Sequence, residues 1–96
     1  MPAACRLGDM STGHDGFNPR PNSQGSANVF INGIAAHRVG DQWPPHKRPS
    51  SASHPGVLAQ GSPNVFVNGV ALGRIGDAIS CGDTVAQGSP NVFVNG

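Results

Sequence analysis

The 96-residue sequence is poor in charge and has no long apolar segment. Six basic and five acidic side chains give a formal net charge of +1, and the absence of a basic stripe argues against a nucleic-acid partner. No apolar run approaches the length that a membrane span requires. The first residues lack the apolar core of a signal peptide, so we expect synthesis in the cytoplasm and any export by a route other than the general secretory signal.

The chain also has little from which to build a hydrophobic core. It contains 14 glycines and 9 prolines, but only five aromatic residues: Phe17, Phe30, Trp43, Phe66 and Phe93. A chain of this length is expected to form one domain, 1–96, and such a thin core needs a staple, which is a disulfide, a metal or a partner. We expect Cys5 and Cys81 to be metal ligands or buried thiols in preference to a disulfide, because a cytosolic origin disfavours disulfides.

What the sequence does contain is a ten-residue segment that occurs three times almost unchanged, at residues 24–33, 60–69 and 87–96. Each copy begins with Gln-Gly-Ser, which breaks the preceding structure, and continues as Asn-Val-Phe followed by Val or Ile. These β-branched and aromatic residues predict a short strand. The Asn-Gly pair at the end predicts a two-residue hairpin turn, because both positions of that turn need a positive φ.

A second segment follows the turn in two of the copies, at residues 34–41 and 70–77, and residues 2–9 match it without a first half before them. The sequence therefore predicts three hairpins, one of them split between the chain ends, with 2–7 pairing with 91–95. This pairing would close a pseudo-threefold ring and remove free strand edges. We expect an all-β fold of short strands and hairpins, with a broad symmetric platform at the hairpin end and an asymmetric opposite end.

Three connections of unequal length join these units, at residues 10–23, 42–60 and 78–87. The second is the longest irregular segment and includes the linker-like stretch 49–53. Arg20, Lys47 and Arg48 are expected to be solvated loop charges. No segment shows the apolar periodicity of a helix.

Each connection carries a possible metal ligand four or five positions after the Gly-Asp pair that ends the repeat: His14, His46 and Cys81. Equivalent turns would bring these side chains to one axis, where His54 can supply the fourth ligand of a tetrahedral zinc site. Three histidines and one thiolate suit zinc, with iron as the runner-up. Such an ion would supply the missing staple, worth on the order of 10 kcal/mol of folding free energy.

Other recurring residues are expected to have structural roles. Three aspartates follow glycine in identical turns, where they should accept backbone hydrogen bonds: Asp9, Asp41 and Asp77. Three arginines recur in the same unit and are expected to pair with carboxylates: Arg6, Arg38 and Arg74. At an exposed site such a pair is worth under about 1 kcal/mol. Cys5, His37 and Gly73 share one equivalent position, so we assign it a structural role. Trp43 and Phe17 are expected to provide apolar cover near the ligands.

These residues resemble the PAAR-repeat proteins. Residues 2–9, Pro-Ala-Ala-Cys-Arg-Leu-Gly-Asp, are similar to the Pro-Ala-Ala-Arg opening of the family with Cys5 inserted, and 61–69 and 88–96 match its hairpin motif. The resemblance covers the whole chain and implies a β cone that caps the trimeric spike of a type VI secretion system or a contractile phage tail. It also implies a zinc ion near the point, held by three histidines and one cysteine: His14, His46, His54 and Cys81.

The expected function is mechanical. A monomer would dock its hairpin base on a trimeric β-helical spike, be ejected with it, and help to puncture a target cell envelope on contraction. The resemblance implies a bare tip without an effector extension. One alternative is a zinc hydrolase, but the chain has no glutamate, and Asp15 beside His14 is the only serious general base. The other is a free zinc-binding adaptor module without a piercing role.

Overall fold

The structure is a computed structural model that describes residues 2–13, 17–48 and 51–94, with the backbone alone at 46–48 and 51–54. Within these ranges the fold is all-β, as predicted, and its strands form three separate two-stranded antiparallel sheets. The strands are β1 (Phe30–Ile31), β2 (Ile34–Ala35), β3 (Gln42–Arg48), β4 (Ser51–Val57), β5 (Phe66–Val67) and β6 (Val70–Ala71). No helix that could cross a membrane is found in the described ranges.

The repeated Asn-Gly pairs form the predicted hairpin turns. Asn32 and Gly33 have φ values of 56° and 76°, and the second pair repeats them within a degree, at 55° and 77°. These turns join β1 to β2 and β5 to β6 in the same register, with Phe30 opposite Ala35 and Phe66 opposite Ala71. The strands are only two residues long, so each hairpin is shorter than the sequence pattern indicates.

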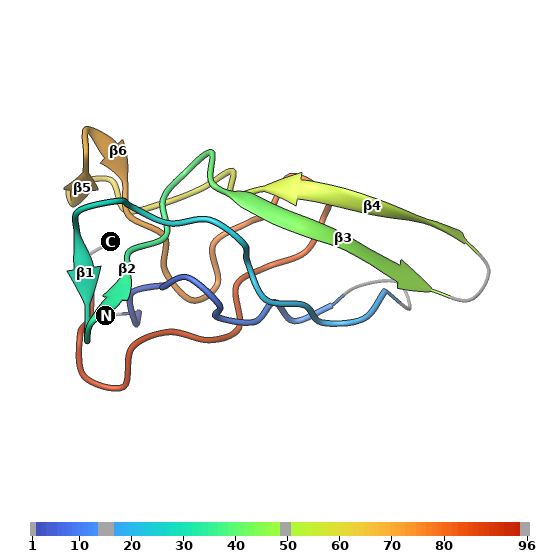
Figure 1. Ribbon diagram of the computed structural model, residues 1–96, viewed down its shortest axis with the longest axis horizontal. Helices are drawn as coiled ribbons and strands as arrows, with labels where there is room; N and C mark the ends of the chain where they lie inside the picture. Colours follow the sequence, from blue (N-terminus) through green and yellow to red (C-terminus); the bar gives the residue numbers. More distant parts are fainter. Residues whose placement is uncertain (1, 14–16, 49–50, 95–96) are drawn as a thin grey trace.

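The third hairpin is formed by the two ends of the chain. Ala3 pairs with Phe93 in the position that Ala35 and Phe30 occupy in the first hairpin. The amide of Ala4 donates to the carbonyl of Val92 at 3.0 Å, and the amide of Val94 donates to the carbonyl of Pro2 at 2.8 Å. The chain ends accordingly lie together at the hairpin end of the molecule (Figure 1). The predicted split repeat is confirmed, although residues 2–7 form isolated bridges and not a continuous strand.

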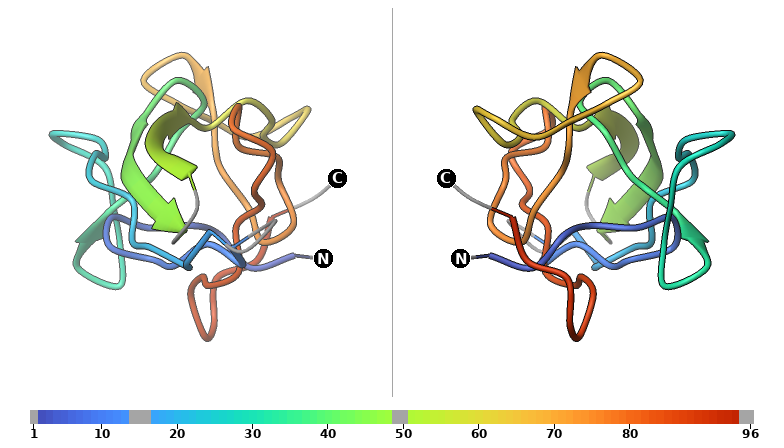
Figure 2. Two further views of the ribbon diagram at one scale, coloured as in Figure 1. Left: turned by 90° about the vertical axis from the view of Figure 1, so that its right-hand side faces the viewer. Right: turned by 90° about the vertical axis from the view of Figure 1, so that its left-hand side faces the viewer.

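A closed cycle of backbone hydrogen bonds links the three units around the central axis. The amide of Cys5 donates to the carbonyl of Gly73 (2.8 Å), that of Gly73 to His37 (2.9 Å), and that of His37 back to Cys5 (3.1 Å). A second cycle runs in the opposite sense: the amides of Leu7, Val39 and Ile75 donate to the carbonyls of Ala35, Ala71 and Ala3, respectively. The pseudo-threefold arrangement is visible along the axis (Figure 2). Because every unit satisfies the backbone groups of the next, the ring has no free edge at this level.

The Gly-Asp turns have the same internal geometry in all three units. In the unit that contains β5 and β6, the amide of Arg74 donates to Asp77 Oδ2 at 2.8 Å, and the guanidinium adds bonds of 3.0 and 2.8 Å to the two carboxylate oxygens. This confirms the predicted role of the aspartates. The expected pairing of the arginines is confirmed, and the Arg74 and Asp77 side chains are only 7% and 4% exposed. Arg74 Nη2 also donates to the Gly61 carbonyl at 3.2 Å, a contact that sequence spacing alone does not reveal.

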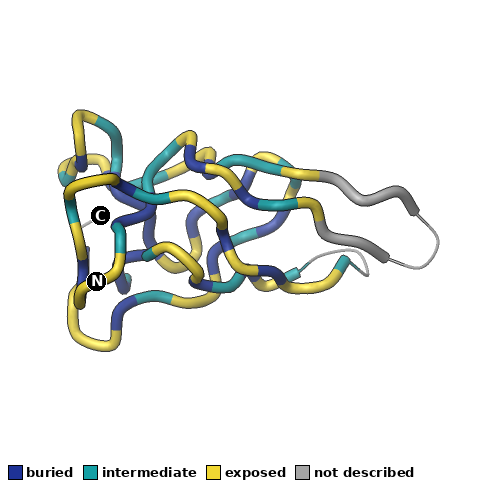
Figure 3. Tube along the Cα trace, in the orientation of Figure 1, coloured by how far each residue is buried: buried dark blue, intermediate teal, exposed yellow. Residues whose placement is uncertain are grey.

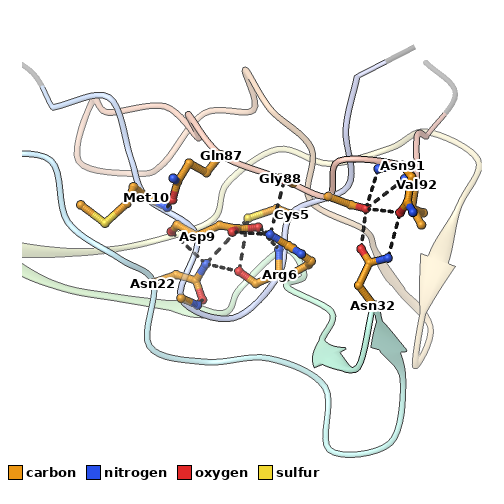
Figure 4. Close-up of polar contacts among 12 residues, drawn as sticks. Cys5, Arg6, Asp9, Met10, Asn22, Asn32, Gln87, Gly88, Asn91 and Val92 are labelled. Carbon is orange, nitrogen blue, oxygen red and sulfur yellow. Dashed lines mark hydrogen bonds and ion pairs between the residues drawn. The ribbon is translucent and has the colours of Figure 1, made fainter.

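The glutamine that begins each repeat also has a structural role, which the sequence analysis missed. The side-chain carbonyl of Gln87 accepts the amide of Met10 at 2.9 Å, beside the Arg6–Asp9 pair (Figure 4). Gln24 and Gln60 accept the amides of Gln42 and Ala78 in the same way. Each glutamine therefore fixes the start of the loop that leaves its own unit.

The molecule narrows from the hairpins toward the far ends of β3 and β4, and its principal extents are 38, 25 and 21 Å (Figure 1). We call the hairpin end the base. Residues 10–21, 42–57 and 78–84, each closed by an antiparallel pair, are called the tip loops. The prediction that 42–60 is irregular is wrong, since β3 and β4 make the longest ladder of the fold within the described ranges. Prolines hid the strand pattern, and a two-stranded ribbon tolerates them at its open edges.

Two apolar clusters fill the interior, and buried residues gather between the base and the start of the β3–β4 ribbon (Figure 3). The cluster at the base is built from the inward residues of the hairpins: Ala4, Ile31, Ala36, Val67, Leu72 and Val94. The second cluster is asymmetric and includes residues of the tip loops: Cys5, Trp43, Leu58, Ile79 and Val85. The first cluster therefore supports the base, and the second anchors the tip loops.

Candidate docking base and metal centre

Three phenylalanines project from the base at equivalent positions. Phe30, Phe66 and Phe93 are 58%, 58% and 53% exposed, although each alternates along its strand with a buried aliphatic residue. A surface phenylalanine needs no explanation by itself, but three at matched positions around one axis form a repeated apolar feature. The sequence analysis counted these residues only as scarce aromatic groups. Their identical place in three alternating strands was the available signal that they share one face.

Side chains of neighbouring hairpins are linked across the same base. Asn32 Nδ2 donates to Asn91 Oδ1 at 2.8 Å (Figure 4), and Asn68 Nδ2 donates to Asn28 Oδ1 at the same distance. Serine hydroxyls of the repeat, such as Ser26 Oγ to Asn68 Oδ1 at 2.6 Å, add further links. The base is thus a cross-linked platform that holds its three phenylalanines at fixed positions.

The structure tests the four predicted metal ligands unequally. His14 lies outside the described residues. His46 and His54 are described by their backbone, and the register places them directly opposite one another on β3 and β4. Such opposed residues are the closest neighbours across an antiparallel ladder, so two of the predicted ligands occupy paired positions.

Cys81 is a half-buried residue that forms no disulfide, and it lies against β4. A Cβ atom at Gly56 would lie 3.3 Å from Cys81 Sγ, so the sulfur approaches the strand at this glycine. Gly56 and His54 belong to the same strand, β4. The donor set of three imidazoles and one thiolate suits zinc, and this placement of Cys81 beside the strand of His54 fits such a site.

Among the residues whose side chains are described, no group of three or more His, Cys, Asp or Glu side chains lies close enough together to hold a metal ion. Cys5 is fully buried in the asymmetric cluster, and His37 is fully buried against the Trp43 ring of that cluster, with the ring centres 5.3 Å apart; both agree with their structural assignment. Burial raises the pKa of the Cys5 thiol, and burial likewise lowers the pKa of His37 against the opposing effect of its bond to the Gln24 carbonyl. Both side chains are therefore neutral groups of the core.

Trp43 and Arg20 are the buried residues of the tip loops that were assigned a role from the sequence. Trp43 is fully buried in the cluster against which Cys81 packs, which is the packed position expected for it. The prediction that Arg20 is a solvated loop charge is wrong. Arg20 is 5% exposed and pairs with Asp83 at 2.9 Å, a partner 63 positions away that local composition could not indicate.

Comparison with known proteins agrees with this geometry. Residues 49–96, half of the chain, match the PAAR motif family, and the chain therefore belongs to that family. This makes it a spike-tip-type protein of a secretion or phage system, in a family that is structural and not enzymatic and that generally binds spike partners. No curated protein gives a significant match to the sequence.

Proposed function

We propose that this protein is the sharp tip that caps a trimeric β-helical spike through its base. The observation that carries the proposal is the set of three equivalent exposed phenylalanines around the pseudo-threefold axis. A trimer with true threefold symmetry offers three identical sites, which one chain can fill only if its own contacts repeat three times. Backbone groups of the hairpins would also extend the β structure of the spike.

The apolar contacts are large enough to matter for binding. Burying the exposed half of one phenylalanine removes on the order of 100 Å² from water. At roughly 25 cal/mol per Å², this is worth about 2–3 kcal/mol for each side chain, before the cost of association is subtracted. Three such contacts around one axis would fix the orientation of the tip as well as its affinity.

The second part of the proposal is one structural zinc ion at the narrow end, with iron as the runner-up. Its ligands would be His14, His46, His54 and Cys81. The opposed positions of His46 and His54 and the approach of Cys81 to β4 support this assignment. When bound, the ion would join the tip loops and stiffen the end that meets the target envelope. The protein would be made in the cytoplasm, assembled on the spike, and ejected with it to puncture a cell envelope.

Co-purification with a trimeric spike protein tests the docking surface. We expect a variant with serine at Phe30, Phe66 and Phe93 to lose the complex. The matched control carries Leu7→Ser and Ile75→Ser, because both residues are 40% exposed but lie in the turns that follow the hairpins. Retention of the complex by the triple variant would show that the base is not the docking surface. A protein that binds zinc but no spike would instead be a free adaptor module.

Metal analysis tests the narrow end. We expect about one zinc ion per chain, as for a single four-ligand site. His14→Ala and Cys81→Ala should each lose the metal and part of the solubility. A wild-type protein that stays folded and soluble after exhaustive chelation would contradict the structural role of the ion.

A further inference from the structure

Arg20 touches all three tip loops with one side chain. Its Nε donates to the Pro44 carbonyl at 2.8 Å, its Nη1 to Asp83 Oδ2 at 2.9 Å, and its Nη2 to Cys81 Sγ at 3.3 Å. Arg20 belongs to the first tip loop, Pro44 to the second, and Asp83 and Cys81 to the third. The guanidinium therefore lies at the point where the three loops converge.

The orientation of this guanidinium is determined by contacts other than the one to sulfur. Its carbon lies 5.4 Å from the centre of the fully buried Trp43 ring, and its Nη1 also reaches Ser11 Oγ at 3.4 Å. Asp83 is itself held by Thr12 Oγ1 and by the Thr84 amide, both at 2.8 Å. Because the guanidinium is a rigid planar fork, these contacts decide where its Nη2 points. That nitrogen points at Cys81.

Gly56 makes the close approach of these groups possible. A Cβ atom there would lie 3.4 Å from Arg20 Nη2 and 3.3 Å from Cys81 Sγ, and 2.9 Å from Ile79 Cγ2. The last distance is too short for a side chain to be accepted without a shift. The bare backbone of β4 thus lets Arg20 and Cys81 lie next to the strand that carries His54.

The Asp83 carboxylate is a fixed partner for this guanidinium. Its side chain is fully buried and pairs with Arg20 Nη1 at 2.9 Å, so the pair keeps the buried guanidinium in place.

We propose that Arg20 is a positioning residue for the metal centre, which holds the Cys81 sulfur in the orientation that binds the ion. This inference rests on the proposed metal site. Residues that donate hydrogen bonds to metal ligands orient them, and their loss typically lowers metal affinity by about 10–100-fold. A merely structural Arg20–Asp83 pair would affect stability but not the metal–sulfur bond.

The test compares Arg20→Lys with Arg38→Lys. Lysine keeps the charge, but a single ammonium group cannot donate to Pro44, Asp83 and Cys81 in the fork geometry. The control removes the same fork from another largely buried pair, since Arg38 bonds Asp41 through two contacts of 3.0 Å. Zinc affinity is measured by competition with a chromophoric chelator, and the cobalt-substituted protein reports the thiolate-to-metal charge-transfer absorption.

We expect Arg20→Lys to bind zinc about 10–100-fold more weakly and to show an altered charge-transfer band. Arg38→Lys should lose stability and keep both the affinity and the band of the wild type. Wild-type affinity and an unchanged band in Arg20→Lys would overturn the inference and leave the metal site standing. A wild-type protein that binds no metal would overturn both. If Arg20→Lys does not fold, Asp83→Asn replaces it, and an unchanged band in that variant would likewise overturn the inference.

Discussion

Leu58 and Gly73 offer a test of how the asymmetric cluster fits inside the symmetric ring. Gly73 occupies the position that Cys5 and His37 hold in the other two units. An alanine Cβ at residue 73 would lie 2.6 Å from Leu58 Cδ2, closer than real Cβ contacts come. Leu58 is fully buried and fills this space. Residue 73 is therefore a glycine because Leu58 packs over it, and not because its backbone requires one, since its φ is not positive.

The expected energies follow from this packing. Leu58→Ala should cost about 2–5 kcal/mol, because a fully buried leucine leaves a cavity. Gly73→Ala should cost about 1–3 kcal/mol through overpacking, which exceeds the entropic gain that alanine brings at an ordinary φ. In the double variant the new methyl group enters the space that Leu58 vacates. We expect it to be more stable than the sum of the single effects predicts, by about 0.5–3 kcal/mol.

Denaturant unfolding measures this coupling directly. Trp43 is the only tryptophan and lies in the same cluster as Leu58, so its fluorescence reports the region that changes. All four proteins are measured with the same excess of zinc, which keeps any contribution of the metal equal. Additive effects, or a Gly73→Ala variant as stable as the wild type, would refute the packing argument.

Three further predictions concern the body of the protein. Asp77→Asn should cost about 3–5 kcal/mol in calorimetry, because it leaves Arg74 buried without its carboxylate; a loss below 1 kcal/mol, as for an exposed pair, would contradict this. Burial lowers the pKa of His37 in the folded protein, so at a pH below about 6.5 the unfolded chain binds a proton that the folded protein does not. The free energy of unfolding is therefore unaffected by this group above about pH 6.5 and falls as the pH falls below it. Between about pH 7 and about pH 5 the free energy of unfolding, measured by urea titration, should fall less in His37→Gln than in the wild type. An equal dependence on pH in the two proteins would refute this. Gly69→Ala should lower the free energy of unfolding by about 1–2 kcal/mol, measured by urea unfolding. The cause is the φ of 77° alone, since the new Cβ meets no atom within 4 Å. An unchanged urea midpoint would contradict the turn geometry.

The hairpins and their closure could be predicted because their signals are local and repeated. Asn-Gly pairs favour a positive φ, which both described pairs adopt, and the matching of 2–9 with 34–41 and 70–77 revealed the split unit. The turn aspartates were predictable for the same reason. In each case the residues that decide the structure are only a few positions apart.

The tip loops could not be predicted in the same way. Pro44, Pro45 and Pro55 interrupt the strand pattern of β3 and β4, and the register shifts around His46 remove its alternation. The burial of Arg20 depends on Asp83, which is distant in sequence. Which residues of each hairpin face outward at the base depends on how the three hairpins pack against one another, and this packing is not visible in any one repeat. His14 lies outside the described residues, so its role stays a prediction.

The central claim is that one pseudo-threefold chain caps a threefold spike. Native mass spectrometry of the complex with the trimeric spike protein tests it most directly, because it counts the chains of each kind. The account predicts one copy of this protein for each spike trimer. Three copies for each trimer, or binding to a single spike chain alone, would contradict it.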